Sequence, residues 1–207
     1  MNPNRKAIKI IIVEDNKFIR SGWEILLGSR TDFEVIGSYG SFEDASAHDK
    51  ISETDLVLMD LQLPGISGVE GIRQIKSRCP EVTIVVCTAY EDNEKIFEAI
   101  SAGAIGFIEK KAREDEMLFF LRNAVEGVSP MSPNIARKLL SIQKENSRVS
   151  YFLRLNNLGM EQSILEKIAE GKSYTSAASE LHLDVEKVMK TISGIYQKLQ
   201  NKESEKN

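Results

Sequence analysis

The sequence predicts an α/β protein: a five-stranded, doubly wound parallel (βα)5 domain, followed by a second, smaller all-α domain that contains a helix-turn-helix. Over the first 125 or so residues, short apolar runs alternate with amphipathic stretches, which is the pattern of βαβ units. Beyond residue 150 the apolar residues recur at helical spacing. The length of 207 residues accommodates two domains of ordinary size.

Five strands and five helices are expected in the first domain. The strands are expected in short aliphatic runs at residues 9–13, 34–39, 56–59, 83–87 and 106–108. The amphipathic stretches predict helices at about residues 16–29, 42–50, 68–78, 92–102 and 113–126. Because ligands of doubly wound sheets bind at the carboxyl ends of the strands, functional residues are expected where the strands end.

The pattern changes after residue 126. Residues 127–133 (GVSPMSP) contain one glycine and two prolines, which interrupt regular structure. A helix is expected at about residues 134–143, and the polar residues 144–150 are expected to form a linker. These features predict a first domain at residues 1–126, a linker helix and linker at 127–150, and a helical domain at 151–207.

Three helices are expected in the last segment, at residues 161–170, 173–181 and 185–199. Gly171 ends the first of them, while Ser173 and Asp184 are N-cap residues of the other two. One face of the third helix is apolar and comprises Val188, Ile192, Ile195 and Leu199. Helix, turn and helix in this order can place the second helix in a DNA groove.

The composition is that of a soluble globular protein, with 42% hydrophobic and 28% charged residues. The apolar run at residues 10–13 is too short to span a bilayer, and acidic residues follow it where a signal peptide would have a cleavage site. The chain has two cysteines, Cys79 and Cys87, and hence no disulfide framework or CxxC pattern. We therefore expect a cytoplasmic protein without a membrane segment.

The net charge of −4 is unevenly distributed along the chain. Residues 1–145 include 18 basic and 23 acidic residues, whereas residues 146–207 include 9 basic and 8 acidic ones. The helical domain is thus near neutral. That is weak support for nucleic-acid binding, because a DNA-binding domain ordinarily carries a basic patch.

Polar residues follow four of the predicted strands. Glu14 and Asp15 follow the first strand, Asp60 the third, Thr88 the fourth and Lys110 the fifth. Because the carboxyl ends of parallel strands share one edge of the sheet, these side chains are expected to converge. Three crowded carboxylates repel one another unless a cation is present, and oxygen ligands with room for water suit Mg²⁺.

Such a site is suited to phosphoryl transfer. A carboxylate beside a metal ion is a competent nucleophile toward phosphorus. Thr88 can hydrogen-bond the incoming phosphoryl group and Lys110 can offset its charge, and positioning with charge compensation is most of what the transfer requires. A metal-dependent phosphatase acting on an external substrate is a further interpretation of the cluster, but the sequence offers no substrate-pocket motif for it.

The segments IIVEDN, LVLMDLQLPGISGVEGI, VVCTAY and AGAIGFIEKKA resemble the receiver domain of bacterial two-component response regulators, over about residues 7–126. The resemblance implies that Asp60 accepts a phosphoryl group from a histidine kinase. It also implies a Mg²⁺ site formed by Glu14, Asp15, Asp60 and the main-chain carbonyl of Gln62.

The resemblance assigns further roles on the last two strands. Thr88 and Lys110 would bind the phosphoryl oxygens, and Phe107 lies at the family's aromatic switch position. The catalysis implied is limited to Mg²⁺-dependent phosphorylation and dephosphorylation of Asp60 itself, so the chain is not expected to be an enzyme. The family often has Lys-Pro with a cis bond where this chain has Lys110 and Lys111, so no cis bond is assumed.

Residues 127–143 and 165–199 resemble the linker helix and the helix-turn-helix of the LuxR/NarL branch of the same family. The apolar frame is retained, but several polar positions differ, as at Met160 and Ser176 and in residues 187–191. The side chains that remain able to contact DNA are Lys187, Lys190, Thr191, Gln197 and Lys198.

The predicted function is a phosphorylation-controlled transcription regulator that binds DNA as a homodimer, with two recognition helices in successive major grooves. The alternative is a phosphorylation-dependent signalling adaptor whose divergent helix-turn-helix binds a protein in place of DNA. Met189 and Tyr196, seven positions apart, form a stripe beside the apolar face of the last helix. The stripe is interpreted either as an extra core or dimer contact or as a protein-binding surface.

Overall fold

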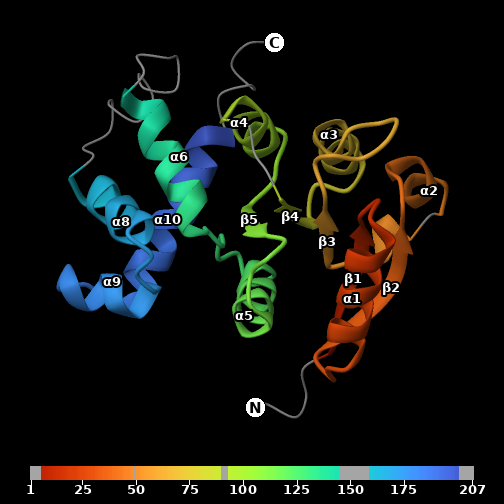
Figure 1. Cartoon of the computed structure of the whole chain (residues 1–207), viewed down its shortest axis with the longest axis horizontal. Helices are drawn as coiled ribbons and strands as arrows, with labels where there is room; N and C mark the ends of the chain where they lie inside the picture. The colour runs from red at the N-terminus through yellow and green to blue at the C-terminus, as the bar shows by residue number, and fades with distance from the viewer. Residues whose placement is uncertain (1–5, 49, 90–92, 145–158, 201–207) are drawn as a thin grey trace.

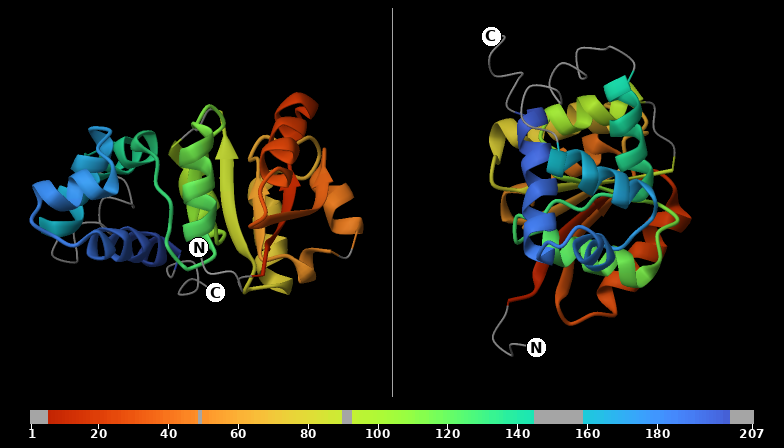
Figure 2. Two further views of the ribbon diagram at one scale, coloured as in Figure 1. Left: turned by 90° about the horizontal axis from the view of Figure 1, so that it is seen from below. Right: turned by 90° about the vertical axis from the view of Figure 1, so that its left-hand side faces the viewer.

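The computed structural model of the chain describes residues 6–48, 50–89, 93–144 and 159–200. Figure 1 shows a sheet flanked by helices and, beside it, a bundle of helices from the C-terminal part of the chain. The bundle lies beside the end of the sheet that the last strand forms (Figure 1), and the left view of Figure 2 shows the two parts side by side.

The strands are β1 (Ile8–Val13), β2 (Phe33–Tyr39), β3 (Leu56–Met59), β4 (Thr83–Thr88) and β5 (Gly106–Glu109). They form one parallel sheet in the order β2-β1-β3-β4-β5, which confirms the predicted doubly wound fold. Every residue of β3 is buried, as expected for a central strand covered on both faces. The strand order reverses between β1 and β3, so the ligand crevice of such a sheet lies at the carboxyl ends of these two strands.

The helices of this part are α1 (Lys17–Gly28), α2 (Phe42–Ala47), α3 (Gly68–Arg78), α4 (Asn93–Ser101) and α5 (Glu114–Ala124). Helices α1 and α5 cover one face of the sheet and α2, α3 and α4 the other (Figure 1). Asn16 is the N-cap of α1, because its side chain accepts hydrogen bonds from the N–H groups of Phe18 and Ile19. Gly68 begins α3 so close to the end of β3 that a Cβ would lie 2.0 Å from the carbonyl oxygen of Asp60.

The predicted elements differ from the observed ones mainly at their ends. Helix α2 ends at Ala47, three residues earlier than predicted, and a short 3-10 helix, η1 (Ile51–Glu53), leads into β3. Strands β4 and β5 each continue one residue further than predicted, to Thr88 and Glu109. The start of the helix predicted at residues 92–102 lies outside the described residues.

The C-terminal part consists, among the described residues, of α6 (Pro133–Lys144), α8 (Gly159–Ala169), α9 (Tyr174–Glu180) and α10 (Val185–Gln200). Helix α6 packs against α8, and α10 packs against both α8 and α9. The predicted apolar face of α10 is buried in this bundle at Val188, Ile192, Ile195 and Leu199. Of the linker predicted at residues 144–150, Lys144 is the last residue of α6, and residues 145–150 lie outside the described part. The three predicted segment boundaries stay a prediction.

The connection between the sheet and the bundle runs along the edge strand β5. Met131 forms a parallel bridge with Phe107, and the N–H of Phe107 donates a hydrogen bond to the carbonyl of Pro130 at 3.2 Å. Gly106 permits this approach, since a Cβ at that position would lie 2.2 Å from Cγ of Pro130. The connecting segment Ser129–Met131 therefore covers the open edge of the sheet.

Candidate functional site

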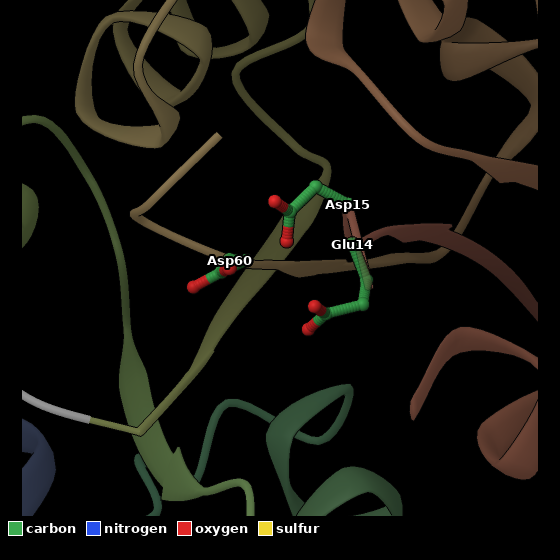
Figure 3. A group of neighbouring side chains, drawn as sticks. All are labelled: Glu14, Asp15 and Asp60. Atoms are coloured by element: carbon green, nitrogen blue, oxygen red, sulfur yellow. The ribbon is translucent and has the colours of Figure 1, made fainter. Parts of the chain in front are cut away.

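Three carboxylates gather at the carboxyl ends of β1 and β3, as the strand-end argument predicts (Figure 3). Glu14 and Asp15 follow β1, and Asp60 follows β3; one oxygen from each lies within 4.8 Å of the others. Glu14 and Asp60 are buried, whereas Asp15 is exposed. Carboxylate oxygens with one side open to water fit the coordination of Mg²⁺, a hard ion that retains several water ligands.

Lys110 joins the two buried carboxylates. Its Nζ lies 2.7 Å from Oε2 and 2.9 Å from Oε1 of Glu14, and 2.8 Å from Oδ2 of Asp60. Burial alone would lower the pKa of Lys110, but hydrogen bonds and charges from Asp60 and Glu14 outweigh it, so the pKa lies above its ordinary value. Burial, reinforced by the charge of Asp60, raises the pKa of Glu14 despite its contact with Lys110.

Main-chain N–H groups also donate to the two buried carboxylates. The N–H of Gln62 donates to Oδ1 of Asp60 at 3.2 Å, and the N–H of Asn16 donates to Oε1 of Glu14 at 3.0 Å. These hydrogen bonds fix both side chains relative to the turns that follow their strands. The structure thus places Gln62 beside Asp60, and the assignment of its carbonyl as a metal ligand stays a prediction.

The predicted residues of β4 and β5 are positioned by the sheet. Thr88 ends β4 and pairs with Glu109, the residue before Lys110, but its side chain lies outside the described part of the chain. Phe107 is buried in β5, where it pairs with Val86. The described residues contain no cis peptide bond, so the bond after Lys110 is trans, and the roles of Thr88 and Phe107 stay predictions.

Residues 10–122 of the chain match the family described as the response regulator receiver domain. The chain belongs to the response regulator receiver family. The carboxylate cluster and Lys110 lie within the matched residues, and the matched part, the receiver domain, includes every strand except the first residues of β1. As a member of this family, the protein is not a catalytic enzyme beyond phosphoaspartate chemistry.

The likeness to response regulators extends over nearly the whole chain. The response regulator protein VraR of Staphylococcus epidermidis is 29% identical over 194 residues, which are 94% of this chain and 91% of that protein. The uncharacterized transcriptional regulatory protein YxjL of Bacillus subtilis is 28% identical over 200 residues, covering 94% of this chain and 90% of its own length. These relatives include the C-terminal helices in the match.

Solved structures agree with the fold. A LuxR-family two-component response regulator from Aurantimonas sp. SI85-9A1 superposes with a TM-score of 0.62 at 26% identity, over 68% of this chain and all of that one. The response regulator RcsB in its complex with DNA superposes with a TM-score of 0.62 at 19% identity, over 94% and 92% of the two chains. At that identity the second likeness concerns the fold alone. No helix among the described residues is long and apolar enough to cross a membrane.

The side chains predicted to contact DNA lie on or beside the exposed face of α10. Lys187 and Gln197 are exposed. Lys190 pairs with Glu186 at 2.6 Å, Lys198 pairs with Glu161 of α8, and the hydroxyl of Thr191 donates to the carbonyl of Lys187 at 2.8 Å. Two of the three lysines are therefore engaged with acidic residues of the bundle.

Of the two stripe residues for which the sequence leaves two interpretations open, Tyr196 faces the receiver domain, whereas Met189 is half-buried against the hydrophobic core. The ring of Tyr196 stacks on Phe107 with centroids 6.5 Å apart, and its hydroxyl donates to the carbonyl of Pro130 at 3.0 Å. One turn further, the side-chain amide of Gln200 donates to the carbonyl of Ala104 at 2.9 Å. Tyr196 is thus buried by an intramolecular contact with the receiver domain.

The connecting segment is held from the bundle side as well. The N–H of Ser129 donates to the hydroxyl of Ser193 on α10, and the N–H of Met131 donates to the hydroxyl of Tyr174 on α9. Sequence reasoning did not identify these contacts. The nearest signal was Gly106, a small residue at the start of an edge strand, which marks a close approach of another segment.

Proposed function

We propose that this response regulator is phosphorylated on Asp60 by a histidine kinase and that it regulates transcription by binding DNA. The arrangement of Asp60 supports the proposal: one oxygen is held by Lys110 and the other by the N–H of Gln62, with two further carboxylates within 4.8 Å. Glu14, Asp15, Asp60 and the carbonyl of Gln62 would hold Mg²⁺. When bound, this ion would offset the negative charge of the carboxylates and the phosphoryl group.

In the proposed transfer, an oxygen of Asp60 attacks the phosphorus of the phosphohistidine. The P–O bond to Asp60 forms while the P–N bond breaks, and the histidine nitrogen leaves with the electron pair. Lys110 and Thr88 bind the phosphoryl oxygens, which requires Lys110 to give up part of its contact with Glu14 and Asp60. Positioning and charge compensation, which these residues supply, are the main requirements of phosphoryl transfer.

Phosphorylation would reach the output helix through β5. Lys110 immediately follows β5, and Phe107 within that strand stacks on Tyr196 of α10. We infer that the described state is the resting one, in which α10 is held on the receiver domain. To shift such an element from 1:99 to 99:1 takes about 5.5 kcal/mol. A few charge-assisted hydrogen bonds, at about 1.5–3 kcal/mol each, supply that much.

The protein would act in the cytoplasm as a homodimer. Its released bundle would contact DNA through Lys187, Lys190, Thr191, Gln197 and Lys198. The exposure of Lys187, Lys190 and Gln197 supports this assignment. The lysines would neutralise phosphates, while Thr191 and Gln197 offer groups for base edges. Two copies would occupy successive major grooves, about 34–36 Å apart.

A second candidate, a signalling adaptor that binds a protein after phosphorylation, is favoured by the charge of the bundle. Lys190 and Lys198 are paired with Glu186 and Glu161, which lowers the positive charge available for DNA phosphates. Residues 146–207 together have 9 basic and 8 acidic residues, and hence no marked basic character.

One pair of experiments separates the two candidates. Chromatin immunoprecipitation with the wild-type protein should recover specific genomic fragments, and Asp60→Asn should reduce that recovery. The purified protein, treated with a small phosphodonor and Mg²⁺, should then retard those fragments, more strongly at low salt than at high salt. If the phosphorylated protein retards no DNA even at low salt, the transcription proposal is wrong and the adaptor remains.

A further inference from the structure

Arg20 lies on α1 next to the carboxylate cluster, and the contacts that hold it are made to the main chain. Its Nη1 donates to the carbonyl oxygen of Glu14 at 2.5 Å and to that of Asp15 at 3.3 Å. The guanidinium also borders Gly40, just after β2, where Nη1 lies 3.4 Å from the position that a Cβ would take. One side chain thus joins the first turn of α1 to the two residues that follow β1.

These two residues supply two of the three clustered carboxylates. The turn that carries them is short, since α1 begins at Lys17. The side chain of Glu14 accepts the N–H of Asn16, and the side chain of Asn16 accepts the N–H groups of Phe18 and Ile19, so these three N–H groups have partners. Arg20 supplies the donors for the opposite set of groups, the carbonyls of Glu14 and Asp15.

We propose that Arg20 is a positioning residue for the Mg²⁺ site: it fixes the main chain of Glu14 and Asp15 and thereby the directions in which their carboxylates point. The inference rests on the proposed function of the cluster. Groups that orient metal ligands typically change metal affinity about 10- to 100-fold when they are removed. The planar guanidinium presents its donors in a fixed geometry, which the flexible ammonium of lysine does not reproduce.

Charge and geometry act in opposite directions at this position, which makes the proposal testable. A positive charge beside a cation site repels the incoming ion, so removal of Arg20 would strengthen Mg²⁺ binding if its charge were the dominant effect. Removal would weaken binding if its hydrogen bonds to Glu14 and Asp15 were dominant. Arg20→Lys retains the charge and loses the geometry, whereas Arg20→Gln loses both.

The test is a Mg²⁺ titration of the full chain, followed by the amide NMR shifts of residues 14–20 and by the fluorescence of Trp23, the single tryptophan. We expect both variants to bind Mg²⁺ about 10-fold more weakly than the wild type. The rate of phosphorylation by acetyl phosphate should be restored at saturating Mg²⁺. Arg30→Gln, an exposed arginine just beyond the far end of α1, is the matched control and should behave as the wild type.

Tighter binding by Arg20→Gln together with unchanged binding by Arg20→Lys would mean that Arg20 acts through its charge, and would overturn the proposal. Unchanged binding by both variants would overturn it as well. If Arg20→Gln does not fold, the Lys variant decides alone. If the wild-type protein neither binds Mg²⁺ nor accepts a phosphoryl group, the proposed function of the cluster fails, which is distinct from failure of the Arg20 inference.

Discussion

The carboxylate cluster and helix α10 both contain several charged side chains, but they hold these charges differently. In the cluster, Lys110 lies between Glu14 and Asp60, which are 96 and 50 positions away in the sequence. On α10, Lys190 pairs with Glu186 one turn away, and both side chains are exposed. Removing a buried partner leaves an uncompensated charge, whereas water replaces an exposed partner at little cost. Each charged side chain of the cluster therefore depends on its partners, whereas the charged side chains on the exposed face of α10 do not.

Tyr196, which faces the receiver domain, behaves more like the cluster than like the exposed face of α10. Tyr196 is buried, its ring stacks on Phe107, and its hydroxyl has a defined acceptor in the carbonyl of Pro130. Burial thus decides whether the loss of a contact is costly or is compensated by water. Helix α10 has contacts of both kinds. Substitutions at buried and at exposed contacts should therefore differ in the size of their effects.

The largest effect is expected for Asp60→Asn. The substitution removes the proposed nucleophile, so labelling by acetyl phosphate in the presence of Mg²⁺ should be lost, as intact-mass spectrometry would show. Asp55→Asn, at the opposite end of β3, is the control and should be labelled normally. Labelling of Asp60→Asn at the wild-type level would show that another residue is the acceptor.

Lys110→Met should destabilise the fold by about 3 kcal/mol, because it leaves Glu14 and Asp60 buried without their cation. The pKa of Glu14 is already raised by burial, and loss of Lys110 raises it further. Glu14 in the folded variant therefore binds a proton more tightly than in the unfolded chain. The loss in free energy of unfolding relative to the wild type should be small at low pH and should grow as the pH rises through the pKa of Glu14.

Urea unfolding of Lys110→Met at several pH values, without Mg²⁺, measures this effect. Lys111→Met is the matched control, because that side chain is exposed and its pairing with Glu109 contributes little. A deficit that does not change with pH would mean that Glu14 stays ionised and is compensated by a group other than Lys110.

Tyr196→Phe should weaken the contact between α10 and the receiver domain by about 1 kcal/mol, or about fivefold in the ratio of held to released bundle. The loss is moderate because the carbonyl of Pro130 retains its hydrogen bond from the N–H of Phe107. Hydrogen exchange at the amides of Ser129 and Met131 reports the release, since both donate to hydroxyls of the bundle. Tyr39→Phe, on the opposite edge strand, should leave their exchange unchanged. Equal exchange in both variants would contradict the inference that Tyr196 holds α10 on the receiver domain.

The smallest effect on folding is expected for Glu186→Gln combined with Glu161→Gln. Stability should remain close to that of the wild type, because Lys190 and Lys198 are exposed and water can replace their partners. DNA binding should become tighter, and the plot of log affinity against log salt should steepen by about 0.9 for each additional phosphate that a lysine neutralises. If binding does not change, these lysines do not face DNA, and the adaptor interpretation is supported instead.

The sheet and the cluster could be predicted from the sequence because both follow from local patterns. Alternation of aliphatic runs with amphipathic stretches identifies the strands, and parallel pairing brings their ends to one edge. Glu14, Asp15, Asp60 and Lys110 therefore had to converge, whatever the details of packing. The end predicted for α2 is too late, since the amphipathic pattern continues beyond Ala47 into the 3-10 helix.

The contacts of the bundle could not be predicted in the same way, because they depend on how two separately patterned parts dock. The spacing of Val188, Ile192, Ile195 and Leu199 identifies the face of α10 that is buried in its own bundle. Nothing in that spacing distinguishes a neighbouring strand from a second copy as the partner of Tyr196. Likewise, the pairing of Lys198 with Glu161 depends on the crossing of α10 and α8 and has no signature in the spacing of either residue.

The segment Ser129–Met131 also protects the molecule from unwanted pairing. Strand β5 is an edge strand, and an uncovered edge is a template for association with other chains. Proline has no N–H to offer a foreign strand, while its carbonyl already accepts from Phe107 and Tyr196. Departure of α10 removes the second of these donors and leaves the first. The segment can therefore remain on β5 while the bundle moves. The edge of the sheet then stays covered during signalling, and it is not exposed to pairing with other chains.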